Sequence, residues 1–347
     1  MRRATIICAS LLCCLLSLQG QIVRKQLHPI QKDGKWGFID SEGHIVVDPQ
    51  FASAGSFSEG LAPVRVGSLY EGKEGYIDDS GRMVIPPQFD GLGNFSEKMA
   101  VITQHSKSGY IDNQGRILID PIFDEADPFS EGMALIKLNG KFGFIDQSGK
   151  IVIPPQFVSA RSFHHGLARV MTFVNDGLRT GYIDKTGRWI LSPQFTLGYD
   201  FSEGRAVIGV GGAVHRGEGR ALLSTGPIKY NFIDANGAVI SKHYFDGARS
   251  NFTEGLLAVK VDGLWGYVNS SGDMVIAPQF DDAAEFSEGL AAVAINYKWG
   301  YVNKAGKFEI APQFDTAEHF TSGLALVSMS HSCGYINRRG EFVWKSS

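Results

Sequence analysis

Short runs of apolar residues alternate with polar turns along nearly the whole chain. In one representative segment, small and apolar residues fill 290–295, and a second run, Trp299 to Asn303, follows after a turn. A third run, 307–310, ends at Ala311-Pro312-Gln313-Phe314, where proline removes a backbone donor and stops strand pairing. Runs rich in Val, Ile, Phe and Tyr between turn residues are typical of β-strands, so the segment predicts three short strands.

This segment recurs with a period of about 34 residues, and three landmarks mark each copy. The landmarks are Gly-aromatic-Ile/Val-Asp/Asn, then Pro-Gln-Phe, then Phe-Ser-Glu-Gly six or seven residues later. The first landmark begins at Gly37, Gly75, Gly109, Gly143, Gly181, Asn231 (degenerate), Gly266, Gly300 and Gly334. One three-stranded unit is barely stable alone, whereas stacked units share a continuous core. We therefore predict an all-β tandem array of about nine units whose recurring aromatic residues form that core.

The two ends of the array bear on its overall shape. A ring that closes by sharing one sheet between both chain ends would split that unit in the sequence. The first unit looks complete, because Leu27 to Gly37 aligns with Leu290 to Gly300, and the last unit is complete through Trp344. We therefore favour an open, curved or superhelical array, with a closed propeller-like ring as the alternative.

The repeats resemble the WG (KWG) β-repeat family at Lys35-Trp36-Gly37-Phe38-Ile39-Asp40 and again at Lys298 to Asn303. The resemblance covers about residues 27 to 347 and implies an exported bacterial repeat protein with interaction roles and no general catalytic residues. The tryptophan itself remains only at Trp36, Trp265 and Trp299. Because Glu, Ser, Phe and Cys333 occupy the same slot in other units, we expect the slot to be half exposed.

The first residues read as a secretory signal peptide rather than as part of the array. Arg2 and Arg3 precede an apolar stretch from Ile6 to Leu18, and polarity returns at Gln19-Gly20-Gln21. We expect a signal peptide at 1–20 and the repeat array at 21–347, with secretion or a periplasmic or cell-envelope location and no membrane span after cleavage. Three of the four cysteines lie in this leader, so no disulfide framework is expected.

Composition and charge exclude some classes of function. The formal net charge of −3 gives no footprint for nucleic acid. The recurring Asp after the second strand begins an Asp-x-x-Gly turn, and its exchange for Asn in the last units favours turn chemistry over Ca²⁺ binding. The equivalent Glu residues of Phe-Ser-Glu-Gly supply no unequal acid–base pair for glycoside hydrolysis. We therefore expect no enzyme, no catalytic or metal-binding residues and no cofactor.

Three insertions mark the place where specific contacts are most expected. They fall at 67–74, 172–180 and 208–230, all between the first and second strands of their units. Equivalent turns of a regular array line one edge, and insertions there commonly mark a binding face. The candidate binding residues on this edge are Tyr70, Glu71, His215, Arg216, Glu218 and Arg220.

Repetition itself favours one kind of function over the others. An extended repeat surface suits a non-catalytic scaffold that binds a protein or glycan partner. A structural component of the cell envelope is the alternative. A glycan-active enzyme is the outsider, because it would need one cleft with unequal titratable groups.

Overall fold

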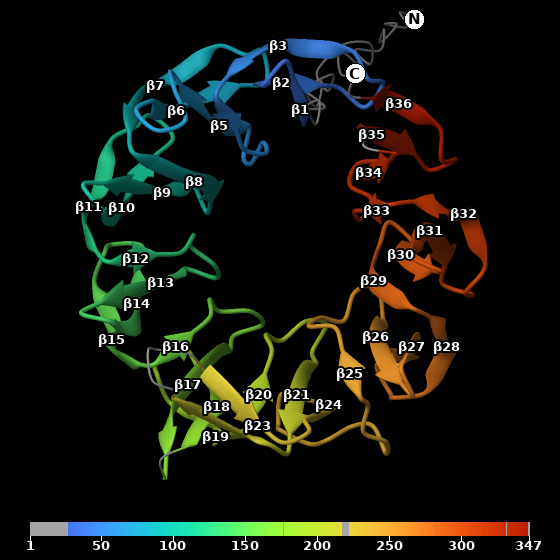
Figure 1. Cartoon of the computed structure of the whole chain (residues 1–347). Helices are drawn as coiled ribbons and strands as arrows, with labels where there is room; N and C mark the ends of the chain where they lie inside the picture. Colours follow the sequence, from blue (N-terminus) through green and yellow to red (C-terminus); the bar gives the residue numbers. More distant parts are fainter. Residues whose placement is uncertain (1–26, 176, 217–221, 331, 346–347) are drawn as a thin grey trace, which may run out of the picture.

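The apolar runs form β-strands throughout the part of the chain that the structure, a computed structural model, describes. That part comprises residues 27–175, 177–216, 222–330 and 332–345. Small antiparallel sheets follow one another around a ring, with the first and last sheets side by side (Figure 1). No helix long and apolar enough to cross a membrane occurs among the described residues.

Each sheet, here called a blade, contains up to four strands that are named by their place from the ring interior outward. The inner strands are β4 (Ser53–Ala54), β8 (Gly91–Ser96), β12 (Glu125–Ala126), β16 (Ser159–Ala160), β20 (Leu197–Gly198), β25 (Gly247–Ala248), β29 (Asp282–Ser287) and β33 (Thr316–Ala317). The first long strands are β1 (His28–Lys32), β5 (Leu61–Val66), β9 (Met99–Gln104), β13 (Met133–Leu138), β17 (Ala168–Val174), β21 (Ala206–Val210), β26 (Leu256–Val261), β30 (Leu290–Ile295) and β34 (Leu324–Met329).

The second long strands and the outer strands complete the blades. The second long strands are β2 (Lys35–Ile39), β6 (Lys73–Asp78), β10 (Lys107–Asp112), β14 (Lys141–Asp146), β18 (Gly177–Ile183), β24 (Lys229–Ile233), β27 (Leu264–Asn269), β31 (Lys298–Asn303) and β35 (Ser332–Asn337). The outer strands are β3 (Ile45–Phe51), β7 (Met83–Phe89), β11 (Ile117–Phe123), β15 (Ile151–Phe157), β19 (Trp189–Phe195), β28 (Met274–Phe280), β32 (Phe308–Phe314) and β36 (Phe342–Lys345).

Consecutive strands pair antiparallel within each blade, and the chain then crosses to the inner strand of the next blade. Within the described residues, blade 1 (β1–β3) lacks an inner strand and blade 6 (β20, β21, β24) lacks an outer one. Most blades thus contain the three strands expected from the sequence and, in addition, a short inner strand that was not expected. Several of these inner strands have only two residues, such as Ser53–Ala54, which explains why the sequence pattern reads there as a connection.

The glycine of the Gly-aromatic landmark lets the outer strand come close to the second long strand. A Cβ on Gly300 would lie 2.5 Å from the carbonyl oxygen of Ile310 and 2.7 Å from the nitrogen of Pro312. The pairing of β31 with β32 is shifted at this point, between Trp299 and Tyr301. Any side chain larger than hydrogen would push the outer strand away, so the landmark requires glycine.

The two kinds of turn on one face of the ring have the chemistry that their sequences predict. In Phe-Ser-Glu-Gly of blade 8, Glu288 and Gly289 have φ angles of 53° and 78°, as a two-residue turn with both residues left-handed requires. In the Asp-x-x-Gly turn of blade 2, the Asp78 carboxylate accepts the backbone N–H groups of Ser80 and Arg82. The prediction that the recurring Asp is a turn residue is confirmed.

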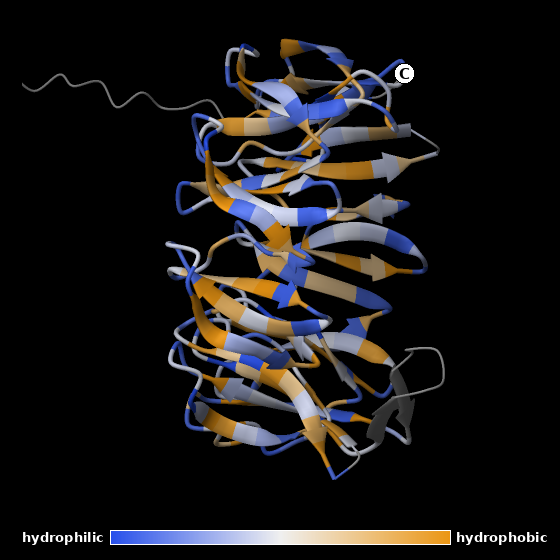
Figure 2. Cartoon of the chain, turned by 90° about the vertical axis from the view of Figure 1, so that its left-hand side faces the viewer, coloured by the Kyte–Doolittle hydropathy of each residue, from blue (hydrophilic) through white to orange (hydrophobic). Residues whose placement is uncertain are grey.

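The expected aromatic core is confirmed and lies between blades rather than within them. Tyr301 of blade 8 is 0% exposed and packs on Phe320 of blade 9, with ring centroids 4.8 Å apart. Its hydroxyl donates to the backbone carbonyl of Glu318 in the inner segment of blade 9, at 2.7 Å. Figure 2 shows the sheets stacked one above another, with apolar residues along their strands. Each aromatic therefore ties its blade to the next one along the chain.

The Phe-Ser-Glu-Gly landmark adds two further bonds to each regular junction. At the junction of blades 8 and 9, the Ser287 hydroxyl donates to the carbonyl of Phe320 at 2.7 Å. The Glu288 carboxylate accepts the N–H of Gly323 at 3.0 Å. The same Ser bond recurs from Ser58, Ser96 and Ser130, and the same carboxylate-to-backbone bond recurs from Glu59, Glu97, Glu131, Glu203 and Glu254. These recurrent carboxylates thus join neighbouring blades.

The closed ring, held as the alternative from sequence, is the arrangement found, and the preference for an open array was wrong. Blade 9 meets blade 1 directly: the Tyr335 hydroxyl donates to the carbonyl of Pro29, and its ring lies 5.4 Å from that of His28. A Cβ on Gly43 would lie 2.3 Å from the carbonyl of Val343. Closure uses packing between two blades instead of a shared sheet, so complete terminal units do not exclude it.

Candidate functional site

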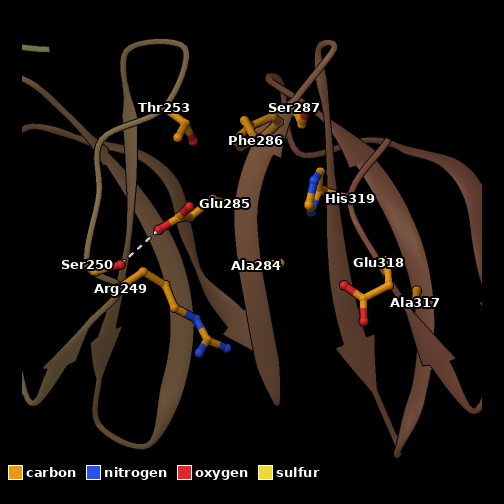
Figure 3. A pocket seen from close by; sticks show the side chains of 10 residues that line it. All are labelled: Arg249, Ser250, Thr253, Ala284, Glu285, Phe286, Ser287, Ala317, Glu318 and His319. Carbon is orange, nitrogen blue, oxygen red and sulfur yellow. Dashed lines mark hydrogen bonds between the residues drawn. The ribbon is translucent and has the colours of Figure 1, made fainter. Parts of the chain in front are cut away.

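A cavity of about 550 Å³ lies on the inner side of the ring across blades 7, 8 and 9. It is built from inner segments, the stretches between Pro-Gln-Phe (or its variants) and the landmark Phe. Its lining residues are Arg249, Ser250, Thr253, Ala284, Glu285, Phe286, Ser287, Ala317, Glu318 and His319. Figure 3 shows these side chains coming from three successive segments. Because the inner segments differ in sequence from blade to blade, the side chains that line this cavity are particular to blades 7, 8 and 9.

Arg249 forms one wall and is held in place by its own blade and the next. Its Nε donates to the carbonyl of Ala283 at 2.7 Å, and its guanidinium also pairs with Asp282. The guanidinium carbon lies 4.8 Å from the ring centre of Trp265. With its donors engaged and its face stacked, Arg249 shapes the cavity and joins blades 7 and 8.

Glu285 and Ser250 form a second fixed pair across the same junction. The Ser250 hydroxyl donates to the Glu285 carboxylate at 3.2 Å, and the N–H of Asn251 donates to the same oxygen at 3.2 Å. In Figure 3 the two side chains point toward each other. Glu285 therefore faces the cavity with one oxygen already used by blade 7.

Three groups that line the cavity have no polar partner among the described residues. The Thr253 hydroxyl is buried without a hydrogen bond, although the equivalent Ser residues of other blades donate to the next blade. Glu318 and His319 are exposed, and no ion pair or side-chain hydrogen bond is found for either in the described part of the chain. A donor–acceptor hydroxyl, a carboxylate and an imidazole are thus left to face a ligand.

Burial and nearby charge set the ionisation of the groups around this wall. Burial raises the pKa of Tyr301 well above its ordinary value, and the Glu318 carboxylate raises it further, so the hydroxyl stays a donor. On the opposite part of the ring, burial raises the pKa of Asp127, against the opposing effect of Arg161. Asp127 and Glu318 occupy equivalent places in blades 4 and 9, so the inner wall differs chemically from blade to blade.

The residues predicted from the insertions come from two distant blades. Tyr70 and Glu71 lie in the turn between β5 and β6, where Tyr70 is 96% exposed. His215 and Arg216 belong to β22 (Ala213–Arg216), which pairs with β23 (Leu222–Thr225) in an added hairpin, while Glu218 and Arg220 lie outside the described residues. Blades 2 and 6 are on opposite parts of the ring (Figure 1), so these residues do not form one site.

One group of side chains in the described part of the chain has the composition of a metal site. Ligand atoms of Asp40, Glu42 and His44 lie within 4.8 Å of one another. The Asp40 carboxylate already accepts the N–H groups of residues 42 and 44 as part of the Asp-x-x-Gly turn. The turn accounts for the grouping, because equivalent Asp residues make the same bonds in other blades.

Sequence reasoning did not find the cavity residues, because the inner segments read as polar connections. One signal was available at the two positions before the landmark Phe. These positions are Gly55-Ser56 in blade 2, Asp127-Pro128 in blade 4 and Glu318-His319 in blade 9. In a repeat that otherwise keeps its landmarks, such variation marks side chains that the fold does not require.

Comparison with known families gives one match that covers most of the chain. The family model described as WG containing repeat matches residues 36–70, 75–107, 109–142, 142–172, 181–212, 232–265, 265–299 and 299–330. No match is found among curated proteins.

Solved structures similar to the chain share little sequence with it. An uncharacterized protein from Listeria monocytogenes EGD-e is 9% identical, with 82% of this chain and 94% of that chain covered and a TM-score of 0.36. A quinonprotein alcohol dehydrogenase-like protein from Bacteroides thetaiotaomicron VPI-5482 is 11% identical, with 93% and 75% covered and a TM-score of 0.33. The tricorn protease is 12% identical, with 92% of this chain covered and a TM-score of 0.26, and the chain spans only 39% of its length.

Proposed function

The chain belongs to the family of WG-containing repeat proteins, and we propose that it is an exported, non-catalytic scaffold that binds a protein or glycan partner on the inner side of its ring. The Thr253 hydroxyl carries this proposal. A buried hydroxyl without a partner costs about 1–3 kcal/mol, so a folded protein keeps one where something else uses it. A sugar hydroxyl or a peptide amide that enters the cavity would supply the missing hydrogen bond.

The other groups of the cavity fit the same kind of partner. Glu318 accepts hydrogen bonds, His319 both donates and accepts, and Phe286 and Ala284 give the wall an apolar part. Ligand pockets commonly combine a mostly apolar lining with a few polar groups that fix orientation. The Ser250–Glu285 pair is tied to the backbone of Asn251 and bridges two blades, which is a structural use of a hydroxyl–carboxylate pair.

Export is part of the proposal and rests on the leader. The basic start, the apolar stretch and the polar return at Gln19 to Gln21 are typical of a secretory signal peptide. We expect the mature chain to begin near Gln21, and N-terminal sequencing of the secreted protein tests this. A chain found in the cytoplasm that still begins at Met1 would contradict export.

The test of the binding site compares two threonines. Thr253→Val removes the cavity hydroxyl, and Thr180→Val removes a second buried hydroxyl without a partner that lies outside this cavity. Both variants should gain about 1 kcal/mol of stability, because each loses an unsatisfied polar group. Only Thr253→Val should lose capture of soluble polysaccharides or envelope proteins by the immobilised mature chain. Equal capture by the two variants would remove the cavity from the proposal.

The outcomes also separate the alternatives that repetition leaves open. Co-sedimentation of the protein with insoluble envelope material, unchanged in Thr253→Val, would favour a structural component. Release of reducing ends from a captured polysaccharide, lost in Glu285→Gln, would favour a glycan-active enzyme. Reversible capture without turnover is the expected result.

The predicted insertion edge remains a second proposed contact surface. Tyr297, in the β30–β31 turn equivalent to the turn that carries Tyr70, is 92% exposed and has a φ angle of 63°. A bulky residue in this conformation is strained, and such strain often accompanies function. Tyr70→Ser together with Tyr297→Gly should weaken partner capture without loss of stability. Deletion of 209–229 tests the longest insertion in the same assay, and unchanged capture by both would remove this edge.

A further inference from the structure

The inner side of the junction between blades 9 and 1 lacks parts that the regular junctions have. In a regular junction, the Tyr of one blade packs on the landmark Phe of the next blade's inner segment, as Tyr301 does on Phe320. Blade 1 has no inner strand in the described part of the chain. A cavity of about 340 Å³ occupies this place, between the inner segments of blades 9 and 2. We call this cavity the seam notch.

Apolar side chains that are buried in other blades are partly exposed in the seam notch. Tyr335 lines it and is partly exposed, whereas its equivalents Tyr76, Tyr110, Tyr182, Tyr267 and Tyr301 are at most 1% exposed. Phe57, the landmark Phe of blade 2, is also partly exposed, and Leu326 of β34 is 38% exposed. An apolar side chain that filled the notch would cover all three.

A buried polar atom also lies in the notch without a partner. His28 is 6% exposed, and its Nε2 has no hydrogen bond in the described part of the chain. Burial lowers the pKa of His28, against the opposing effect of Glu288, so the ring is neutral at pH 7 and carries one donor and one acceptor nitrogen. A donor or acceptor from an occupant would satisfy Nε2.

The notch also exposes an edge of β1 that could accept another strand. In blade 9 the carbonyl of Leu326 accepts the N–H of Glu318, and that of Ser328 accepts the N–H of Asp315. The equivalent carbonyls of blade 1 belong by register to Pro29 and Gln31. Pro29 accepts the Tyr335 hydroxyl instead. An extended segment laid along β1 would restore the missing pairing.

The chain's own sequence before Leu27 does not carry the landmark that fills this place elsewhere. Where other units have Phe-Ser-Glu-Gly, residues 23–26 are Val23-Arg24-Lys25-Gln26. The positions of the inner strand correspond to Gln19 and Gly20, at the expected cleavage site. If the leader is cleaved near Gly20 as expected, the positions equivalent to the inner strand leave the chain, and Gln26 stands where other units have the landmark glycine.

We propose that the seam notch binds an extended peptide segment of a partner protein, which adds the missing inner strand to blade 1 and places an aromatic side chain against Tyr335. A basic residue next to that aromatic would meet the unpaired carboxylate of Glu318, which borders the notch. This inference narrows the proposed binding role to a protein partner at one junction and rests on that role and on cleavage of the leader.

The test uses a peptide that copies the inner segment of blade 5, Val158 to Leu167, in which Arg161 precedes the landmark Phe163, as a strand supplied in trans. It is titrated into the mature chain and followed by fluorescence anisotropy. Binding of micromolar order is expected, and a peptide with Phe163→Ala should bind at least about tenfold more weakly. Leu326→Arg in the protein should weaken binding similarly. Its control is Leu264→Arg, at an equally exposed leucine (39%) outside the notch, which should change nothing.

Each of the next four outcomes overturns the inference. Absence of binding to the wild-type mature chain removes it, as does equal binding to Leu326→Arg. Binding that appears only in Val23→Asp would assign the notch to the chain's own N-terminal segment. A dimer of the mature chain that the peptide dissociates would assign it to a second copy. Loss of peptide binding with retained Thr253-dependent capture would leave the cavity proposal intact, and the reverse result would leave only the seam.

A variant whose own N-terminal segment is designed to occupy the seam notch gives an independent test of the peptide site. Val23→Phe with Gln26→Gly restores two landmark residues in the mature chain and should let its own N-terminal segment fill the notch. Peptide affinity should then fall at least about tenfold, while the wild-type chain keeps it. Unchanged affinity of this variant would count against the notch as the peptide site.

Discussion

The junction of blades 8 and 9 and the junction of blades 9 and 1 solve the same packing problem with different residues. Blade 8 reaches blade 9 through a Tyr hydroxyl, a Ser hydroxyl and a Glu carboxylate, each bonded to the backbone of the next blade. At the seam, Tyr335 reaches β1, and Thr321-Ser322 stands where Ser-Glu is found. On the outer side both junctions are alike, because the turn of one blade packs on the preceding outer strand at Gly340 and at Gly43.

Among the described residues, ring closure uses the outer and middle strands of blades 9 and 1, and blade 1 contributes no inner strand. A regular junction is specified by short landmarks that lie close together in sequence. The seam joins residues about as far apart as the chain allows, such as Pro29 and Tyr335. The Ser-Glu pair of the landmark is replaced by Thr321-Ser322 at the seam, so closure of the ring does not depend on that pair.

The largest expected effect comes from removing the tyrosine ring at each junction. Tyr301→Ala takes a fully buried ring and a hydrogen bond from the regular junction and should cost about 4 kcal/mol of unfolding free energy. Tyr335→Ala removes a partly exposed ring and should cost about 2 kcal/mol. Urea unfolding of both variants measures the difference. Equal costs would show that the seam is packed as tightly as a regular junction.

Acid should weaken the regular junctions through their carboxylates. Burial opposes ionisation of Glu254, but hydrogen bonds from Gly289 and Lys304 outweigh it and lower its pKa below the ordinary 4.5. The unfolded state therefore binds the proton more tightly, so the carboxylate stabilises the fold at neutral pH and this contribution is lost as the pH falls through the lowered pKa. Glu254→Gln should cost about 1 kcal/mol at pH 7 and nothing at pH 2. Thermal unfolding at both pH values checks this.

Seam residues should show no such dependence, which provides the control. Ser322 occupies the place of the Glu in blade 9, so Ser322→Ala should have the same effect at pH 7 and at pH 2. A loss of stability in Glu254→Gln that persists at pH 2 would mean that the side-chain shape, and not its charge, supports the junction.

The smallest expected effect concerns the hydroxyl of the same landmark. Ser287→Ala removes a hydrogen bond to the carbonyl of Phe320 and should cost about 1 kcal/mol. Thr321→Ala, at the seam, should cost clearly less, because no partner for its hydroxyl is found among the described residues. Urea denaturation measures the unfolding free energy of both variants, which can be compared directly if its dependence on urea concentration is the same in both. A larger cost for Thr321→Ala would show that the seam hydroxyl has a structural partner.

The sequence predicted those features of the fold that repeat locally. The landmark glycines, the aromatic core at positions such as Tyr301, and the Asp turns follow from residue types at fixed spacing. The half exposure expected of the tryptophan slot holds for Trp36, Trp265 and Trp299, whereas Ser108 and Thr180 in the same slot are buried. Such features depend on contacts within one unit or between consecutive units. The residues that make these contacts recur at the 34-residue period and can therefore be recognised in the sequence.

The ring and the candidate site could not be predicted in the same way. Closure depends on a small rotation between successive blades that adds up around the whole array, and no single unit shows it. The cavity gathers Arg249, Glu285 and His319 from three units, each from a segment whose sequence varies. The seam notch exists only because the ends meet, so Leu326 looks in sequence like any other core position.

The forward direction of the junction bonds has a consequence for how the protein is made. Every Ser, Glu and Tyr bond of a regular junction runs from one blade to the blade that follows it in the chain, so each new unit can dock on its predecessor as synthesis proceeds. Contacts between neighbours in sequence form quickly, whereas a contact between distant residues pays a larger loop-closure entropy and comes late. We therefore expect meeting of the first and last blades to be the slow step of folding, and its reversal to open the ring while the stacked sheets stay intact.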